Sequence, residues 1–194
     1  MLLKSRLNIY YKLLKKWVIK IIYYQNNEFY IYIDFMNIKE CTELLKNSLF
    51  FNINSLVDMA CIDWLVRIPN RFSIYYNFYS YVYNYRLFII IDIPLYLNYF
   101  YGVGIESICS VFPAAIWLER EIWDMFGVYF YNHFDLRRIL TDYGFVGFPF
   151  RKDFPLVGFK ELRYDDTYKI IVYENIKLMQ DYRVFDFINP WEKD

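Results

Sequence analysis

Regular alternation of hydrophobic and polar residues predicts several β-strands. In residues 72–79 every second side chain is a large apolar one, which indicates a strand with one buried face. Residues 28–35 alternate in a similar way. Residues 87–93 form a run rich in isoleucine, typical of a central strand. Residues 52–64 are expected to be extended, and residues 67–70, which contain Pro69, to form a turn.

The first 22 residues have a helical pattern instead. Their large apolar residues recur at spacings of four and three, and six basic residues precede the first acid, Glu28. Two interpretations stay open: a cleaved mitochondrial presequence, which is basic and acid-free, or a permanent helix that packs on a partner. The apolar seam favours the permanent helix.

Two further helices are expected on capping signals. Asn37 followed by Glu40 resembles a capping box, and it would start a short helix that turns Ile38, Cys41, Leu44 and Leu45 inward. Pro113 can occupy the first turn of a helix that continues to Phe126 and ends at Gly127.

Glycine and proline change the character of the chain after residue 126. A short helix capped by Asp135 is expected over residues 136–140, and the remainder has little periodicity. The sequence therefore predicts an α+β fold, a small mixed sheet with flanking helices, followed by an extended C-terminal interaction arm. The predicted parts are an amphipathic basic helix (1–22), an α+β core domain (23–126) and the arm (127–194), which would dock on partner subunits.

The composition bears on two questions: where the gene lies and whether the protein has a large interface. Of the 194 residues 57% are hydrophobic, and the chain has 22 Tyr and 19 Phe. This residue usage matches AT-rich codons, so the gene is expected in an organelle. The aromatic residues reflect either that codon bias alone or a large protein interface, where Tyr and Phe are enriched. We favour the interface.

The net charge and the cysteine content argue against several classes of protein and of metal site. The formal net charge is zero, which argues against a nucleic-acid binder. The three cysteines, Cys41, Cys61 and Cys109, form no CxxC pair, so neither a zinc site nor an iron–sulfur cluster is expected from this chain alone. No clean apolar run of about 20 residues is present, so no transmembrane span is expected.

Residues 117–127 contain the densest charge. Four charged residues alternate with tryptophan and aliphatic residues, which predicts a helix buried nearly all round with its charges paired. Arg120 and Asp124 are one turn apart and are expected to pair, with Glu119 and Glu121 bound by arginines from later in the chain. The alternative makes Glu119, Glu121 and Asp124 catalytic carboxylates, but no nucleophile motif or metal spacing accompanies them.

The only histidine, His133, is interpreted as a hydrogen-bonding residue rather than a metal ligand or proton relay. The basic pair in residues 151–156 lies among apolar residues and two prolines, as expected of a docking segment rather than a solvated loop. No residue is assigned a catalytic, cofactor or metal role. The predicted structural and interface residues are Glu119, Arg120, Glu121, Trp123, Asp124, His133, Asp135, Arg137, Arg138, Arg151, Lys152 and Asp153.

These motifs together resemble a known family. The string Glu-Arg-Glu-Ile-Trp-Asp-Met-Phe-Gly at 119–127 is followed by His133, by residues 135–145, and by Arg-Lys-Asp-Phe-Pro-Leu at 151–156. This succession closely resembles the 30 kDa subunit family of mitochondrial complex I (NADH:ubiquinone oxidoreductase). Looser matches extend the resemblance over residues 28–192. Two positions depart from the family pattern: Phe134, where the family usually has proline, and Phe148, where histidine is common.

The resemblance implies a non-catalytic α+β core subunit of the peripheral arm, on the matrix side of the mitochondrial inner membrane, which supports assembly and electron transfer from NADH to ubiquinone. It implies no cofactor in this chain, with FMN, iron–sulfur clusters and ubiquinone in neighbouring subunits. The implied partners are the large quinone-site (49 kDa) subunit and an iron–sulfur subunit.

Two other functions stay open at this point. One is a stand-alone acid–base enzyme that uses Glu119, Glu121 and Asp124. The other is a module that binds a membrane surface through the basic residues between positions 4 and 20.

Overall fold

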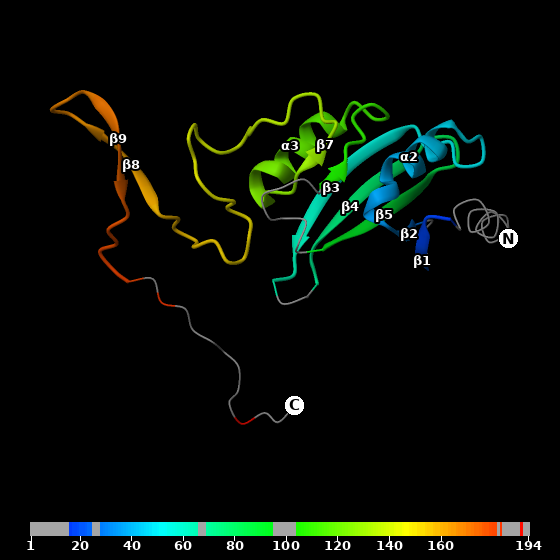
Figure 1. The fold of residues 1–194 in the computed structure, drawn as a ribbon, viewed down its shortest axis with the longest axis horizontal. Helices are drawn as coiled ribbons and strands as arrows, with labels where there is room; N and C mark the ends of the chain where they lie inside the picture. Colours follow the sequence, from blue (N-terminus) through cyan, green and yellow to red (C-terminus); the bar gives the residue numbers. More distant parts are fainter. Residues whose placement is uncertain are drawn as a thin grey trace. The chain divides into compact units, whose positions relative to one another are not determined.

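The computed structural model describes residues 16–24, 28–65, 69–94 and 104–181, together with Arg183 and Trp191. The chain divides into two compact units, Met1–Phe154 and Pro155–Asp194. The centre of the first unit is a five-stranded sheet in the order β1-β2-β5-β4-β3 (Figure 1). Within this sheet the β2–β5 pair is parallel and the other pairs are antiparallel, so the sheet is mixed. The strands are β1 (Val18–Tyr24), β2 (Glu28–Ile33), β3 (Ser55–Asp63), β4 (Asn70–Ser80) and β5 (Tyr85–Pro94).

One face of this sheet forms the core. The register places Ile31, Ile89, Tyr76 and Met59 in one row across four strands, and all four side chains are buried. Neighbouring rows repeat the pattern with other apolar residues, because residues directly opposite one another share a face. Asp63 stands at the end of such a row, beside Phe72, and places a buried acid at the edge of this apolar face.

Two helices contribute to the same core. Helix α2 (Ile38–Asn47) follows a short 3-10 turn, η1 (Phe35–Asn37), and buries Ile38, Cys41 and Leu45. Helix α3 (Ala115–Phe126) buries Ala115 and Ile122 among the same cluster of residues. A two-stranded parallel sheet accompanies them, formed by β6 (Ile105–Glu106) and β7 (Phe130–Tyr131).

Gly127 ends α3 in the left-handed conformation, with φ of 76°. A Cβ atom at this position would lie 2.6 Å from the Arg151 guanidinium and 2.6 Å from the Phe148 ring. Glycine is therefore required here for both the backbone turn and the close packing of residues 148–151 against the helix end.

The second unit contains a single hairpin of β8 (Lys160–Asp165) and β9 (Ile170–Asn175) within its described residues.

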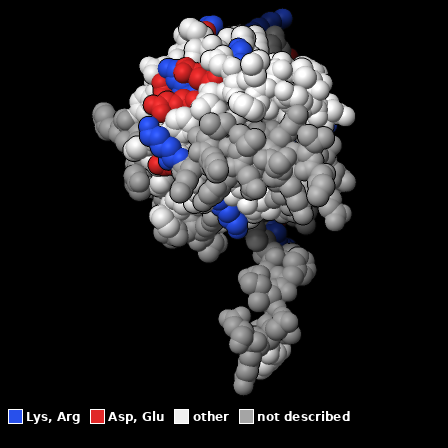
Figure 2. Space-filling view, turned by 90° about the vertical axis from the view of Figure 1, so that its right-hand side faces the viewer, with Lys and Arg blue, Asp and Glu red and all other residues white. Residues whose placement is uncertain are grey.

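On the face of the molecule shown in Figure 2, acidic and basic side chains lie close together, and most other described atoms belong to uncharged residues. In the part of the chain that is described, no helix combines the length and apolar character that a membrane crossing requires.

Most predicted elements are present. The α+β class and the mixed sheet are confirmed, as are the strands at 28–35, 52–64, 72–79 and 87–93 and both capped helices. Asn37 makes no side-chain capping bond, so the predicted capping box does not form. Within the predicted turn, residues 67 and 68 lie outside the described residues.

Two predicted helical segments differ from the structure. Residues 18–22, predicted as the end of the basic helix, belong to strand β1, because their β-branched side chains pair with β2; residues 1–15 lie outside the described residues. The short helix over 136–140 is absent. Residues 127–154, the first part of the predicted arm, belong to the compact unit Met1–Phe154, and the docking of the arm on partner subunits stays a prediction.

Candidate functional site

Three buried acids, Asp63, Glu119 and Asp124, lie in the first unit, and we call them the carboxylate anchors. Glu119 and Asp124 project from α3, and Asp63 ends β3. Each accepts hydrogen bonds from backbone N–H groups of a different loop, which is how an acid remains buried at a tolerable free-energy cost.

Glu119 holds the loop that follows β6. Its Oε1 accepts the Ile108 N–H at 2.9 Å, and its Oε2 accepts the Ser107 hydroxyl at 2.6 Å and the Cys109 thiol at 3.3 Å. Burial raises the pKa of the Glu119 carboxyl, and these three hydrogen bonds offset only part of the rise. The side chain therefore resists ionisation more than an exposed glutamate does.

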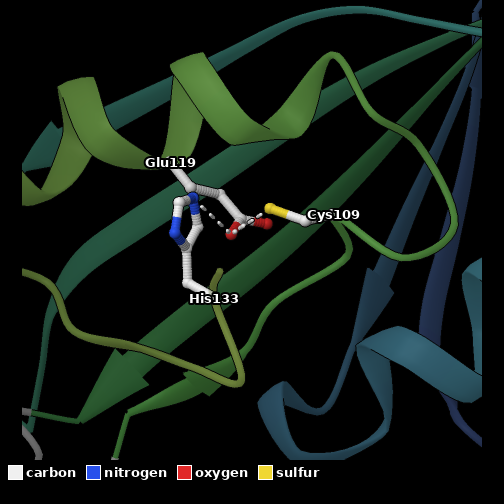
Figure 3. Close-up of side chains that lie close together, drawn as sticks. All are labelled: Cys109, Glu119 and His133. Carbon is white, nitrogen blue, oxygen red and sulfur yellow. Dashed lines mark hydrogen bonds and ion pairs between the residues drawn. The ribbon is translucent and has the colours of Figure 1, made fainter. Parts of the chain in front are cut away.

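His133 approaches the same carboxylate from the loop after β7, and the three side chains of Cys109, Glu119 and His133 converge (Figure 3). Their possible ligand atoms lie within 4.8 Å of one another, which is the spacing of a metal site. The His133 ring, however, is already engaged. Its Nδ1 accepts the Asp135 N–H at 3.0 Å, and its Nε2 lies 3.1 Å from the Ile116 carbonyl and 3.9 Å from Glu119 Oε2.

These contacts determine the histidine tautomer. A backbone N–H can only donate, so Nδ1 is unprotonated and the proton of the neutral ring is on Nε2. A metal ligand must offer a free nitrogen lone pair, and in this arrangement neither ring nitrogen has one. We therefore interpret the cluster as a hydrogen-bonded junction between α3 and two loops, and His133 as the hydrogen-bonding residue that the sequence predicts.

Asp124 holds a second loop. Its Oδ2 accepts three successive backbone N–H groups, from Ile139 at 3.1 Å, Leu140 at 2.7 Å and Thr141 at 2.9 Å. Its Oδ1 accepts the Thr141 hydroxyl at 2.7 Å and lies 3.4 Å from Arg138. Burial alone would raise the pKa of Asp124, but these hydrogen bonds outweigh burial and lower it.

Asp63 holds a third loop, across 89 residues of sequence. It accepts the Lys152 N–H at 2.9 Å and the Leu65 N–H at 3.0 Å, and Arg71 binds both carboxylate oxygens at 2.8 Å. Arg71 also binds Asp153, at 2.8 and 3.0 Å. Burial opposes ionisation, yet these donors lower the pKa of Asp63 to about 2.

Phe148 connects the two loops held by Asp124 and Asp63. Its ring centroid lies 4.4 Å from the Arg151 guanidinium and 5.1 Å from that of Arg138, so two cations contact one aromatic ring. Arg151 also donates to the Phe126 carbonyl at 2.6 Å, and Arg138 to the Gly147 carbonyl at 2.9 Å. Burial lowers the pKa of Arg151, with a further contribution from nearby Arg71.

The structure brings together many predicted residues but changes their pairing. Arg120 does not pair with Asp124; it donates to the Arg137 carbonyl at 2.9 Å and lies over the Trp117 ring at 5.1 Å. Glu119 is bound by Ser107, Ile108 and Cys109 rather than by a later arginine. Sequence reasoning missed these three residues because the Ile108 donor is a backbone N–H, which has no side-chain signature, and because the Ser107 hydroxyl and the Cys109 thiol are uncharged donors that no motif links to Glu119.

Other predicted residues lie outside this network. Trp117 is 63% exposed and Glu121 is also exposed, so α3 is not buried all round in the chain by itself. Trp123 is half-buried and contacts the rings of Tyr129 and Phe148 edge-on. The exposed pair Asp135–Arg137, at 2.6 Å, replaces the predicted helix cap.

Comparisons with known proteins agree with the sequence motifs. Residues 31–160 match the family described as "respiratory-chain NADH dehydrogenase, 30 Kd subunit". NADH-ubiquinone oxidoreductase subunit 9 of Acanthamoeba castellanii is 43% identical over 191 residues, which cover 98% of this chain and 92% of that protein. NADH dehydrogenase (ubiquinone) iron-sulfur protein 3 of Oryza sativa subsp. japonica is 45% identical over 180 residues, which cover 92% and 90%.

Solved structures share the fold. A trypsin-resistant fragment (1–134) of Nqo5 superposes with a TM-score of 0.56 and 23% identity, covering 68% of this chain and 99% of the fragment. A chain of the archaeal membrane-bound sulfane sulfur reductase gives a TM-score of 0.64 and 21% identity, covering 77% and 85%. At these identities the two structures support the architecture alone.

Proposed function

The chain belongs to the 30 kDa subunit family of respiratory-chain NADH dehydrogenase, and we propose that within this complex it is a non-catalytic scaffold of the peripheral arm. It is a subunit of the NADH:ubiquinone oxidoreductase complex. Its proposed role is to support assembly and the electron path from NADH to ubiquinone while the redox groups, FMN, iron–sulfur clusters and quinone, are held by neighbouring subunits.

One observation carries the proposal: the carboxylate anchors bind loops of their own chain with their oxygens. Asp124 binds three N–H groups of residues 139–141 with a single oxygen. The same loop region exposes large apolar side chains, and Tyr143 is 96% exposed. A loop held in shape before binding loses less entropy when a partner covers it, so anchored loops with exposed apolar residues suit a docking surface. Further apolar residues exposed in this region are Leu140, Val146 and Phe150.

The finer assignments follow from the same family membership. We propose the large quinone-site (49 kDa) subunit and an iron–sulfur subunit as partners, with the chain on the matrix side of the mitochondrial inner membrane. The AT-type composition supports a gene in the organelle.

The contacts disfavour a stand-alone acid–base enzyme. General acid–base catalysis needs two groups that converge on one substrate. Glu119 binds the loop at 107–109, Asp124 binds the loop at 139–141, and Glu121 is exposed. The basic positions invoked for membrane binding fall mainly within residues 1–15, which lie outside the described residues.

Two matched substitutions in α3 test the scaffold role. Asp124→Ala leaves three backbone N–H groups without their acceptor, and buried unsatisfied donors cost about 1–3 kcal/mol each. Glu121→Ala removes an exposed acid from the same helix and serves as the control. We expect Asp124→Ala to lower the amount of assembled complex on blue-native gels several-fold, with normal NADH:quinone turnover per assembled complex, and Glu121→Ala to change neither. Full assembly with slowed turnover in Asp124→Ala would assign the residue a chemical role and refute the proposal.

A further inference from the structure

An uncharged surface lies at one end of the five-stranded sheet, opposite to the end that carries Asp63 (Figure 1). It is formed by residues 48–54, which follow α2, and residues 81–84, which connect β4 and β5. We call these two segments the sheet tip. A concentration of exposed apolar side chains marks an interaction site. The sheet tip has four large ones, each more than half exposed: Leu49, Phe50, Tyr81 and Val82.

Hydrogen bonds between the two segments fix the shape of the sheet tip. The Tyr83 hydroxyl donates to the Leu49 carbonyl at 2.9 Å, and the Tyr81 N–H donates to the Asn54 side chain at 3.3 Å. Phe51, next to the exposed residues in sequence, is buried in the core and holds the first segment in place. The exposed side chains are therefore positioned before any partner arrives, which reduces the entropy lost on binding.

The absence of charge separates the sheet tip from an ordinary surface loop. No charged residue occurs in residues 47–57 or in residues 72–85, although 23% of the chain is charged. Codon bias does not explain this, because lysine is also encoded by AT-rich codons and neither stretch contains one. Lys46, just before the first stretch, is directed back into the fold, where it donates to the Val111 carbonyl and lies 5.1 Å from the centre of the Phe112 ring. A surface that covers the tip is therefore expected to be apolar and uncharged.

Two other occupants fit the sheet tip less well. A membrane surface attracts proteins through apolar side chains together with basic residues, and the tip has no basic residue. A second copy of this chain would bury too little surface. The four exposed side chains can lose roughly 500 Å², so two copies would bury roughly 1,000 Å² in total, short of the 1,200 Å² or so at which specific interfaces begin. The patch is sufficient as one part of a larger interface with another polypeptide.

We propose that the sheet tip docks on an apolar, uncharged surface of another subunit of the NADH dehydrogenase complex. This interface is separate from the loop held by Asp63, because the length of β3 places the two surfaces roughly 25 Å apart. The inference rests on the proposed scaffold function and extends it: the chain connects to neighbours at both ends of its sheet and not only through the anchored loops.

Lysine substitutions test this interface, because a charge is tolerated in solvent and is costly when an apolar surface covers it. Leu49→Lys and Val82→Lys place one charge in each segment of the sheet tip. Ile19→Lys is the matched control, because Ile19 in β1 is 74% exposed and precedes Lys20, so its surroundings already carry charge. Full-length chains would be co-expressed with the other peripheral-arm subunits, and the copurified subunits would be quantified. Urea unfolding of each chain by itself checks that the fold is intact.

We expect Leu49→Lys and Val82→Lys to lower the copurified subunits about tenfold, and Ile19→Lys to leave them within about twofold of wild type. All three chains alone should unfold at the urea concentration of wild type. Equal losses in the three variants, or no loss in any, would overturn the inference. Binding of the wild-type chain to phosphatidylcholine–phosphatidylglycerol vesicles, or a homodimer, that Leu49→Lys abolishes would overturn it too, because the occupant would be a different one.

Thiol labelling provides a second measurement that does not depend on a loss of assembly. Tyr81→Cys should react with a maleimide in the free chain and be protected in the assembled complex, with the wild-type chain as the background for the native cysteines. Equal reactivity in both states would show that the sheet tip remains in solvent and would overturn the inference, while the scaffold function would stand. Failure of the wild-type chain to join the complex would instead refute the scaffold function itself.

Discussion

Replacing Asp63 with asparagine removes one buried charge while preserving the shape of the side chain. Each Asp63 oxygen accepts two hydrogen bonds, one from Arg71 and one from a backbone N–H. In Asp63→Asn one oxygen becomes an NH₂ group that faces two donors, whichever way the amide is turned. Breaking a buried ion pair on one side costs about 3–5 kcal/mol. Because Arg71 retains Asp153, we expect the low end, a fall of about 3 kcal/mol in the free energy of unfolding.

The pH dependence of the free energy of unfolding gives a second, independent measure of how much the ionised Asp63 stabilises the fold. The pKa of Asp63 is about 2 in the fold, against an ordinary value of 3.8. Because the folded pKa is depressed, the stabilisation is present above pH 4 and is lost as the pH falls from about 4 to about 2. The difference between the two values corresponds to about 2 kcal/mol, and the side chain is only 1% exposed, so solvent screening is weak.

Urea unfolding of the full-length wild-type and Asp63→Asn chains, followed by tryptophan fluorescence between pH 6 and pH 2.5, measures both quantities. We expect the free energy of unfolding of Asp63→Asn to lie about 3 kcal/mol below that of wild type at pH 6. This difference should shrink by about 2 kcal/mol on going to pH 2.5. Hydrogen exchange of the Lys152 amide should accelerate in the variant, because its acceptor is weakened. A gap that stays constant across this pH range would refute the assignment of the low pKa to Asp63.

Two further substitutions test the electrostatic assignments by the same unfolding series. Burial raises the pKa of Glu119, so the wild-type chain should gain stability relative to Glu119→Gln as the pH falls towards 4.5. This pH dependence has the opposite sign to that of Asp63. A stability difference between the two chains that does not change with pH would contradict the raised pKa. Phe148→His places an imidazole between Arg138 and Arg151, whose charges disfavour its protonation. Its stability should therefore fall below wild type by a further 1 kcal/mol or so as the pH drops through about 6.5, and parallel pH profiles would argue against the stacked arrangement.

Regular patterns made much of the fold predictable. The alternation at 72–79 and the isoleucine run at 87–93 correspond to β4 and β5, and Gly127 ends α3 as expected. The two predicted helical segments that are wrong failed for physical reasons. Residues 18–22 fit a helical seam, but they pair with β2, a contact that no local pattern reveals. The helix over 136–140 does not form, because the N–H groups of residues 139–141 bind Asp124 instead of carbonyls one turn earlier.

The site was predictable in part of its members and not in its connections: Glu119 and Asp124 were among the predicted residues, whereas Asp63 and its partner Arg71 were not. A helix that carries Glu119 and Asp124 among tryptophans must bury charge, so both residues could be selected from sequence. Their partners could not, because an acid next to an arginine in sequence suggests an ion pair, whereas both carboxylates bind mainly backbone N–H groups and hydroxyls. Cys109 and His133 are 24 positions apart in sequence, and only the fold brings them to one carboxylate.

The contacts around Phe148 explain why the loop region between Arg138 and Asp153 can behave as one body. Asp124 holds one end of it through Thr141, and Asp63 holds the other end through Lys152. Between these ends, the Phe148 ring contacts two guanidinium groups that also bind backbone carbonyls. Displacement at one end therefore strains a continuous series of contacts up to the other, and packed contacts of this kind resist gradual deformation. A partner that covers this region meets a surface whose shape is set before binding, so the affinity it gains from the exposed apolar side chains is not offset by the entropy of ordering the loop.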